Sequence, residues 1–127
     1  MKKLISLVAL SLISLSILAQ TQHARAYLFA IGYRDKWTGE IVWKGKPSEC
    51  NILIEIKEYD VVIYSNTEQH YHMISKMEES EDGVMYRMSD SSGTKCNFYM
   101  GPINGSESIY IAIEYNDYSW MYTCVDE

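Results

Sequence analysis

Residues 84–125 read VMYRMSDSSGTKCNFYMGPINGSESIYIAIEYNDYSWMYTCV, and this stretch decides the fold class. Apolar and polar side chains alternate along it with a period of two, as in β-strands that bury one face. Ser91-Ser92-Gly93 suits a three-residue hairpin turn, and Asn116-Asp117 suits a two-residue turn. The second turn sets Ile113 beside Trp120, so one apolar face continues from strand to strand. The stretch therefore predicts a series of antiparallel hairpins.

The same alternation recurs upstream at a spacing of roughly 8–12 residues, with turn signals between the runs. From residue 27 onward Ala and Leu occur only twice each, whereas Val, Ile and Thr together occur 20 times, which is typical of strands. Strands are expected over residues 27–33, 40–44, 50–57, 60–65, 69–77, 84–90, 94–100, 107–115 and 118–125. We expect an all-β fold, an antiparallel meander of about eight or nine strands curled into a small barrel or half-barrel. A two-layer β-sandwich is the alternative.

Residues 1–26 have the pattern of a cleaved signal peptide. Two lysines precede the apolar run Leu4–Leu18, and Ala24-Arg25-Ala26 places small residues where a signal peptidase cleaves. Cleavage after Ala26 would leave one all-β domain over residues 27–127, and cleavage after Ala19 is the alternative. The apolar run is shorter than the roughly 20 residues of a membrane-spanning helix. We therefore expect an exported bacterial protein, periplasmic or extracellular, with no integral membrane segment after cleavage.

The chain is acidic, with a net charge of −6 from 11 Lys and Arg against 17 Asp and Glu. Loss of residues 1–26 removes three basic residues, which leaves 8 against 17 and a net charge of −9. This charge disfavours nucleic acid and anionic membranes as partners. The sequence has no Gly-x-Ser-x-Gly motif, no Gly-rich phosphate loop and no carboxylate pair marked out by its position. We expect a non-enzymatic protein without a cofactor.

His70-Tyr71-His72 is the only stretch that suggests a metal site. Two histidines at i and i+2 of a strand share one face, but zinc needs a third or fourth ligand, for which Glu68 is the local candidate. A two-residue turn before the strand would turn both histidines inward and would require positive φ at Thr67, which a β-branched residue resists. An odd-length loop would instead bury Tyr71 and Met73. We favour the second register, with both histidines in solvent and no metal bound.

Tyr33, Trp37 and Trp43 flank the first expected hairpin. Aromatic side chains near loops often anchor sugars or protein partners. Packing at the end of a barrel is the alternative reading. The leading hypothesis is an interaction module that binds a protein or a glycan through these residues or through its strand edges.

The second hypothesis is a barrel that carries a small apolar ligand. In outline such a barrel resembles the lipocalin type, although Lys36-Trp37-Thr38-Gly39 does not match the Gly-x-Trp pattern of that family. Inward residues such as Ile54, Phe98 and Ile111 are bulky, so we expect side chains to fill a barrel this small. That expectation favours the interaction module. Metal binding through His70 and His72 is a distant third hypothesis.

The three cysteines suit one disulfide and one free thiol in an oxidising compartment. In the meander Cys50 and Cys96 both open their strands and lie at one rim, whereas Cys124 closes its strand and lies at the other. A disulfide requires about 4.4–6.8 Å between Cα atoms, so Cys50 with Cys96 is the possible pair. Three free thiols are the alternative.

Overall fold

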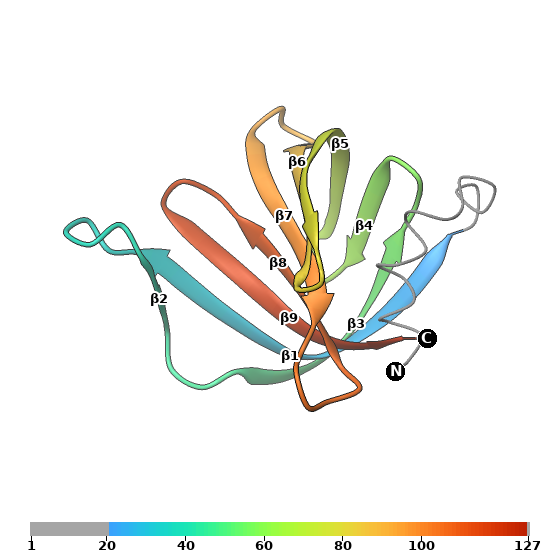
Figure 1. Cartoon of the computed structure of the whole chain (residues 1–127), viewed down its shortest axis with the longest axis horizontal. Helices are drawn as coiled ribbons and strands as arrows, with labels where there is room; N and C mark the ends of the chain where they lie inside the picture. Colours follow the sequence, from blue (N-terminus) through green and yellow to red (C-terminus); the bar gives the residue numbers. More distant parts are fainter. Residues whose placement is uncertain (1–20, 127) are drawn as a thin grey trace.

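The computed structural model describes residues 21–126 as one antiparallel sheet without a helix. The strands of this part are β1 (Gln22–Arg34), β2 (Ile41–Trp43), β3 (Ser48–Ile56), β4 (Asp60–Tyr64), β5 (Glu68–Ser80), β6 (Gly83–Asp90), β7 (Lys95–Pro102), β8 (Ile109–Glu114) and β9 (Tyr118–Asp126). They lie in the order β2-β1-β3-β4-β5-β6-β7-β8-β9, and β1 also pairs with β9 (Figure 1). This last pairing closes β1 and β3–β9 into a barrel, with β2 outside it. The expected all-β barrel is confirmed.

The hairpin registers predicted from turn chemistry are also confirmed. Met88 of β6 pairs with Cys96 of β7, and Ile113 of β8 pairs with Trp120 of β9. In the first of these turns Gly93 has a φ of 86°, the left-handed conformation that this kind of turn needs. Local sequence therefore sets which side chains of the later strands face inward.

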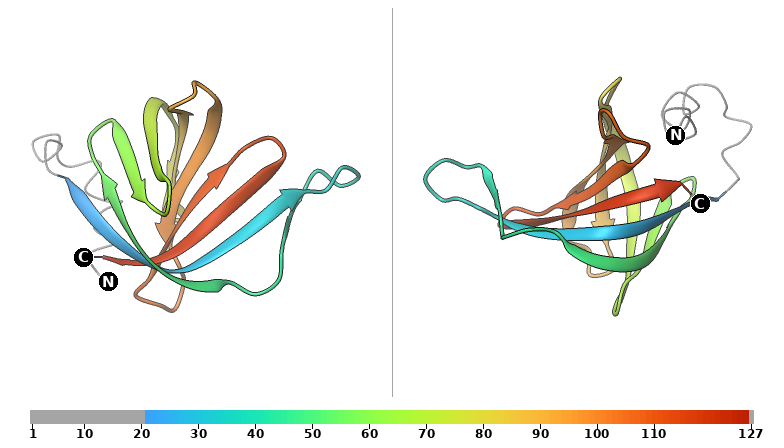
Figure 2. Two further views of the ribbon diagram at one scale, coloured as in Figure 1. Left: turned by 180° about the vertical axis from the view of Figure 1, so that it is seen from behind. Right: turned by 90° about the horizontal axis from the view of Figure 1, so that it is seen from below.

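β2 is the departure from a simple meander. β1 continues past the barrel to Arg34, and there Tyr33 pairs with Val42 of β2 on one side and with Tyr118 of β9 on the other. A side chain at Gly32 would collide with the Ile41 and Trp43 side chains, so glycine permits this close packing. Residues 32–43, called the arm below, form a hairpin that extends from the barrel (Figures 1 and 2).

β1 begins at Gln22, five residues before the domain boundary expected from the sequence. Residues 22–26 pair with residues 52–56 of β3, and Ala24 and Ala26 also pair with β9. Ala24 and Ala26 are 2% and 0% exposed and belong to the core. A cut after Ala26 would therefore fall inside β1. Residues 1–20 of the expected signal over residues 1–26 lie outside the described residues.

A β-bulge at Tyr27 reverses the inward face of β1. The register of β1 against β9 shifts by one residue between Ala26 and Leu28. Ala26 faces the core before the bulge, whereas Phe29 packs against the core after it. Tyr27 itself is exposed. The bulge therefore directs Phe29 into the barrel interior.

Large side chains fill most of the interior. The largest fully buried side chains among the described residues come from five strands of the barrel and are Ile54, Val61, Ile63, Cys96, Phe98, Ile111, Ile113, Tyr122 and Cys124. Because neighbouring strands alternate in direction, the turns at 65–67, 91–94 and 115–117 lie at the same end as the arm. This end is called the mouth below. No helix among the described residues has the length and hydropathy to cross a membrane.

Candidate functional site

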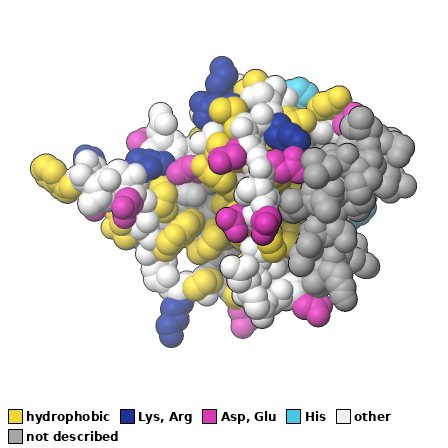
Figure 3. Space-filling view, in the orientation of Figure 1, with side chains coloured by type: hydrophobic (Ala, Val, Ile, Leu, Met, Phe, Trp, Pro, Cys, Tyr) yellow, Lys and Arg dark blue, Asp and Glu magenta, His cyan; other side chains and the backbone are white. Residues whose placement is uncertain are grey.

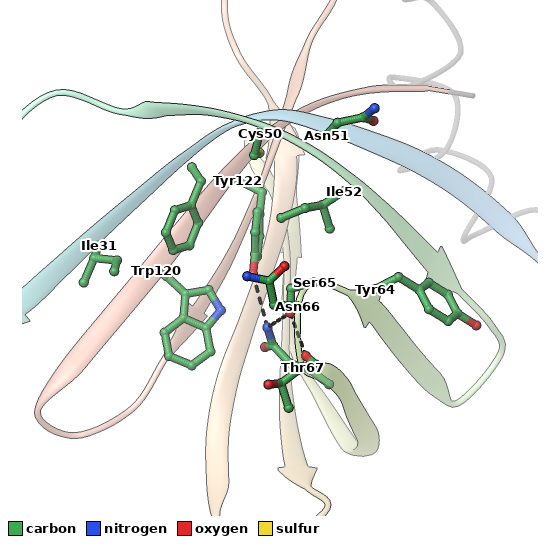
Figure 4. A pocket seen from close by; sticks show the side chains of 12 residues that line it. Ile31, Cys50, Asn51, Ile52, Tyr64, Ser65, Asn66, Thr67, Trp120 and Tyr122 are labelled. Atoms are coloured by element: carbon green, nitrogen blue, oxygen red, sulfur yellow. Dashed lines mark hydrogen bonds between the residues drawn. The ribbon is translucent and has the colours of Figure 1, made fainter.

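A pocket of about 800 Å³ opens at the mouth, beside β1, β3 and β9 (Figure 4). Its described lining residues are Phe29, Ile31, Cys50, Asn51, Ile52, Tyr64, Ser65, Asn66, Thr67, Gln69, Trp120 and Tyr122. The volume lies within the roughly 300–1,000 Å³ range of small-molecule sites. The expectation that side chains fill the barrel is therefore wrong at this end. An eight-stranded barrel is wide enough to hold one small ligand where its interior is not filled.

The inner wall of the pocket is a ladder of cross-strand pairs between β1 and β9. Phe29 is opposite Tyr122, and Ile31 is opposite Trp120. The rings of Phe29 and Tyr122 have centroids 5.4 Å apart, a usual distance for packed aromatic rings. This wall exists because the bulge at Tyr27 brings Phe29 and Ile31 onto the face that Trp120 and Tyr122 already occupy.

The ladder continues along the arm, beyond the pocket itself. Tyr33 is opposite Tyr118, and the Tyr118 ring stacks on Trp120 at a centroid distance of 5.4 Å. Tyr115 lies 5.1 Å from Tyr118 on the same side. Hydrophobic side chains also gather on the visible surface where the arm meets the barrel (Figure 3). An apolar ligand could therefore extend from the pocket onto this aromatic surface.

The polar rim of the pocket is a hydrogen-bond network centred on Gln69. The Gln69 amide Nε2 donates to Ser65 Oγ at 2.8 Å and, over 3.4 Å, to the Tyr122 hydroxyl. Its Oε1 accepts from the Tyr71 hydroxyl at 2.6 Å. Ser65 in turn donates to the carbonyl of Thr67 at 2.7 Å. The network fixes the 65–67 turn, and its members are neutral.

Trp120 has an unpaired donor at this site. Its indole Nε1 is buried and makes no hydrogen bond with any described residue. In Figure 4 the nitrogen-bearing edge of the ring faces the polar side chains of the rim. Buried donors are nearly always paired in proteins, so an unpaired one at a pocket needs an explanation.

A smaller hollow of about 260 Å³ lies next to the pocket and shares Gln69 and Trp120 with it. On its far side the Tyr115 hydroxyl donates to Asp90 Oδ2 at 2.7 Å, and Ser92 and Thr94 amides donate to Asp90 Oδ1. Burial acts to raise the pKa of Asp90, but these hydrogen bonds outweigh it and lower the pKa. Asp90 therefore stabilises the 91–94 turn as a carboxylate.

The arm is held in place at its base by Arg34. Its guanidinium donates to Glu114 Oε2 at 2.7 Å, to the Asn116 carbonyl at 2.8 Å and to the Gly39 carbonyl at 2.6 Å. Burial acts to raise the pKa of Glu114, but hydrogen bonds from Tyr99 and Arg34 lower it overall. The carboxylate therefore keeps its charge, and the arm is fixed to the β8–β9 turn.

The three predicted aromatic residues do not form one site. Tyr33 shares the inner face with Ile31, whereas Trp43 packs over Gly32 on the opposite face. Trp37 stands at the tip of the arm and is 94% exposed. Only Tyr33 adjoins the pocket. Phe29, Ile31 and Gln69 were not predicted as site residues, because the bulge and the β1–β9 closure that bring them together leave no local signal in the sequence.

The two histidines lie on the outer surface, as the favoured register predicts. His70 Nε2 is 2.7 Å from Glu68 Oε2, and His72 Nδ1 is 2.9 Å from Asp60 Oδ1. Tyr71 between them is 3% exposed. The three-residue loop at 65–67 produces this register. Each histidine has its own carboxylate partner, and the described residues contain no group of three or more potential metal ligands.

All three cysteines lie in the described part and are free thiols. The suggested disulfide between Cys50 and Cys96 is not present. Cys50 lies close enough to Cys124 to raise the pKa of that thiol, although burial has the larger effect and the pKa reaches about 12. Burial also raises the pKa of Cys96, to about 11. Cys50 lines the pocket and is partly exposed, so it is the thiol that reagents can reach most readily.

The described residues form a closed antiparallel β-barrel with an open, mainly apolar pocket at its mouth. Comparison with family models, with curated proteins and with solved structures finds no match to this chain. The function of the protein must therefore be inferred from the geometry of the pocket.

Proposed function

We propose that this protein is a non-enzymatic binding protein that holds a small, largely apolar molecule in the pocket at the barrel mouth. The observation that carries the proposal is the unfilled volume of about 800 Å³ between the β1–β9 wall and the 65–67 turn. Phe29, Ile31, Ile52 and Trp120 give this space its apolar character. Desolvation of these surfaces by a bound ligand provides the driving force.

The neutral naphthylamine dye N-phenyl-1-naphthylamine tests the proposal. We expect saturable binding with increased dye fluorescence, and we expect Ile31→Glu to weaken it by at least about tenfold, because a carboxylate beside the dye must lose water. Ile31 is 43% exposed, so the substitution should leave the fold intact.

Ile74→Glu is the matched control, because Ile74 is 47% exposed but does not line the pocket. This variant should bind the dye as the unchanged protein does. The dye should also slow alkylation of Cys50 by iodoacetamide, because Cys50 lines the same space. Absence of saturable binding, or equal weakening by both substitutions, would contradict the proposal.

Recognition of a protein or glycan through the arm is the second candidate function. It is favoured by the 94% exposure of Trp37 in a loop that Asp35 holds, because Asp35 Oδ1 accepts from the Trp37 and Thr38 amides at 2.7 and 3.2 Å. An ordered and exposed tryptophan is well suited to a contact surface.

Trp37→Ala separates the two candidate functions. Trp37 lies outside the pocket lining, so dye binding should stay within about twofold and the free energy of unfolding within about 0.5 kcal/mol. Fluorescence titration and urea unfolding measure the two quantities. A large loss of dye affinity would place the dye on the arm and favour the second candidate.

A further inference from the structure

The pocket lining includes a buried donor with no partner among the described residues, and the surrounding groups explain why. Gln69 Oε1 accepts from Tyr71, and its Nε2 donates to Ser65 and Tyr122. The Gln69 side chain, which lines the pocket together with Trp120, is therefore already engaged. Trp120 Nε1 is left with no described partner, and it is shielded from water. A buried donor in this state costs free energy until an acceptor reaches it.

The position of the Trp120 ring directs that donor toward the pocket. Tyr118 stacks on the ring at 5.4 Å and Tyr115 packs against it at 5.7 Å, so neighbours on the β8–β9 turn hold the indole in place. The nitrogen-bearing edge faces the rim side chains in Figure 4. The side chains of Asn66 and Thr67 on the rim turn are exposed and take no part in the Gln69 network, so they can move as a ligand enters while the turn itself stays fixed. An acceptor atom on the ligand would then meet Nε1.

The charge of the pocket limits the ligand further. Its described lining residues include no Lys, Arg, His, Asp or Glu. The whole chain has a net charge of −6, so the surrounding field opposes an anion. A charged group in this apolar space would lose hydration without gaining an ionic partner.

We propose that the ligand is an uncharged apolar molecule with a carbonyl-type oxygen that accepts a hydrogen bond from Trp120 Nε1. This inference rests on the proposed function, because it concerns the same pocket. It names the chemical class of the ligand and assigns Trp120 as the residue that selects it. A site that presents a fixed donor discriminates against otherwise similar molecules that lack the acceptor.

Two pairs of probes test the two parts of the proposal. The first pair is the neutral dye Prodan, which carries a propionyl carbonyl, and its analogue with a propyl group in place of the propionyl. The second pair is N-phenyl-1-naphthylamine and its 8-sulfonate. We expect the sulfonate to bind at least about tenfold more weakly than the neutral dye.

Trp120→Phe keeps an aromatic ring but removes the donor. It should weaken Prodan binding by about tenfold and change binding of the propyl analogue by less than about twofold. The ratio of the two affinities within one variant is insensitive to small changes in packing. The melting temperature of the ligand-free variant should stay the same or rise, because an unpaired buried donor has been removed.

The outcomes separate this inference from the proposed function. If none of the neutral probes binds the unchanged protein, the proposed function itself fails. If the neutral probes bind but Trp120→Phe affects Prodan and its analogue equally, the role of Trp120 is wrong while the pocket remains. Sulfonate binding as tight as that of the neutral dye would overturn the uncharged class of ligand.

Discussion

If the predicted signal directs export, we expect the mature protein to begin at Gln20, with the whole of β1 retained. Cleavage after Ala19 leaves β1 complete, whereas cleavage after Ala26 removes its first five residues. All five residues pair with β3, the last three also pair with β9, and Ala24 and Ala26 are buried in the core. Intact mass of the protein recovered from outside the cytoplasm would identify the N-terminus.

Two shortened chains measure how much the barrel depends on this segment. A chain starting at Tyr27 lacks residues 22–26, and their removal exposes backbone groups of both β3 and β9 at one end of the barrel. This chain should therefore lose cooperative thermal unfolding. A chain starting at Gln22 keeps every paired residue of β1 and should unfold cooperatively. Circular dichroism during heating distinguishes them. Equal stability of the two chains would show that residues 22–26 are dispensable.

Gly101→Ala is expected to destabilise the barrel by about 3 kcal/mol, at the upper end for overpacking. A Cβ at Gly101 would collide with the carbonyl oxygen of Asp82 and lie 3.0 Å from the Cα of Gly83. Both obstacles are backbone, so no side chain can rotate away. To make room for the methyl group, the turn between β5 and β6 would have to move away from the end of β7. Urea unfolding measures the loss as a lower transition midpoint.

Gly105→Ala is the control for this substitution. Gly105 has a φ of 78° and open space around it, so alanine there should cost only about 1 kcal/mol of conformational energy. A similar loss for both variants would mean that the close contact between Gly101 and the β5–β6 turn does not limit packing. The Gly101 variant should also keep its dye affinity where it is folded, because the contact lies at the end of the barrel away from the mouth.

The pocket at the mouth changes the order of the two hypotheses drawn from the sequence, the interaction module and the barrel that carries a small apolar ligand. Bulky inward residues indicated a filled barrel, and side chains such as Phe98 and Ile111 do fill it over much of its length. The open space lies instead beside Phe29, Ile31 and Ile52, toward the mouth end of β1 and β3. We therefore propose the small-ligand function first and recognition through the arm second.

Local sequence was sufficient for the features that depend on neighbouring residues. Turn chemistry at Gly93 gave the register that pairs Met88 with Cys96. Resistance of Thr67 to positive φ disfavoured a two-residue turn, and the observed three-residue loop buries Tyr71 and leaves His70 in solvent. In each case a few adjacent residues restrict the backbone, and the period of two transmits that choice along the strand.

The sequence by itself determined an all-β antiparallel fold, its hairpins and the outward position of both histidines. Tertiary structure alone decided that β1 starts before residue 27, pairs with both β3 and β9, and carries β2 on its edge outside the barrel. It also decided, through the bulge at Tyr27, that Ile31 lines a pocket opposite Trp120. These features depend on contacts between the two ends of the chain, whose energy comes from barrel closure and shared burial rather than from any local pattern.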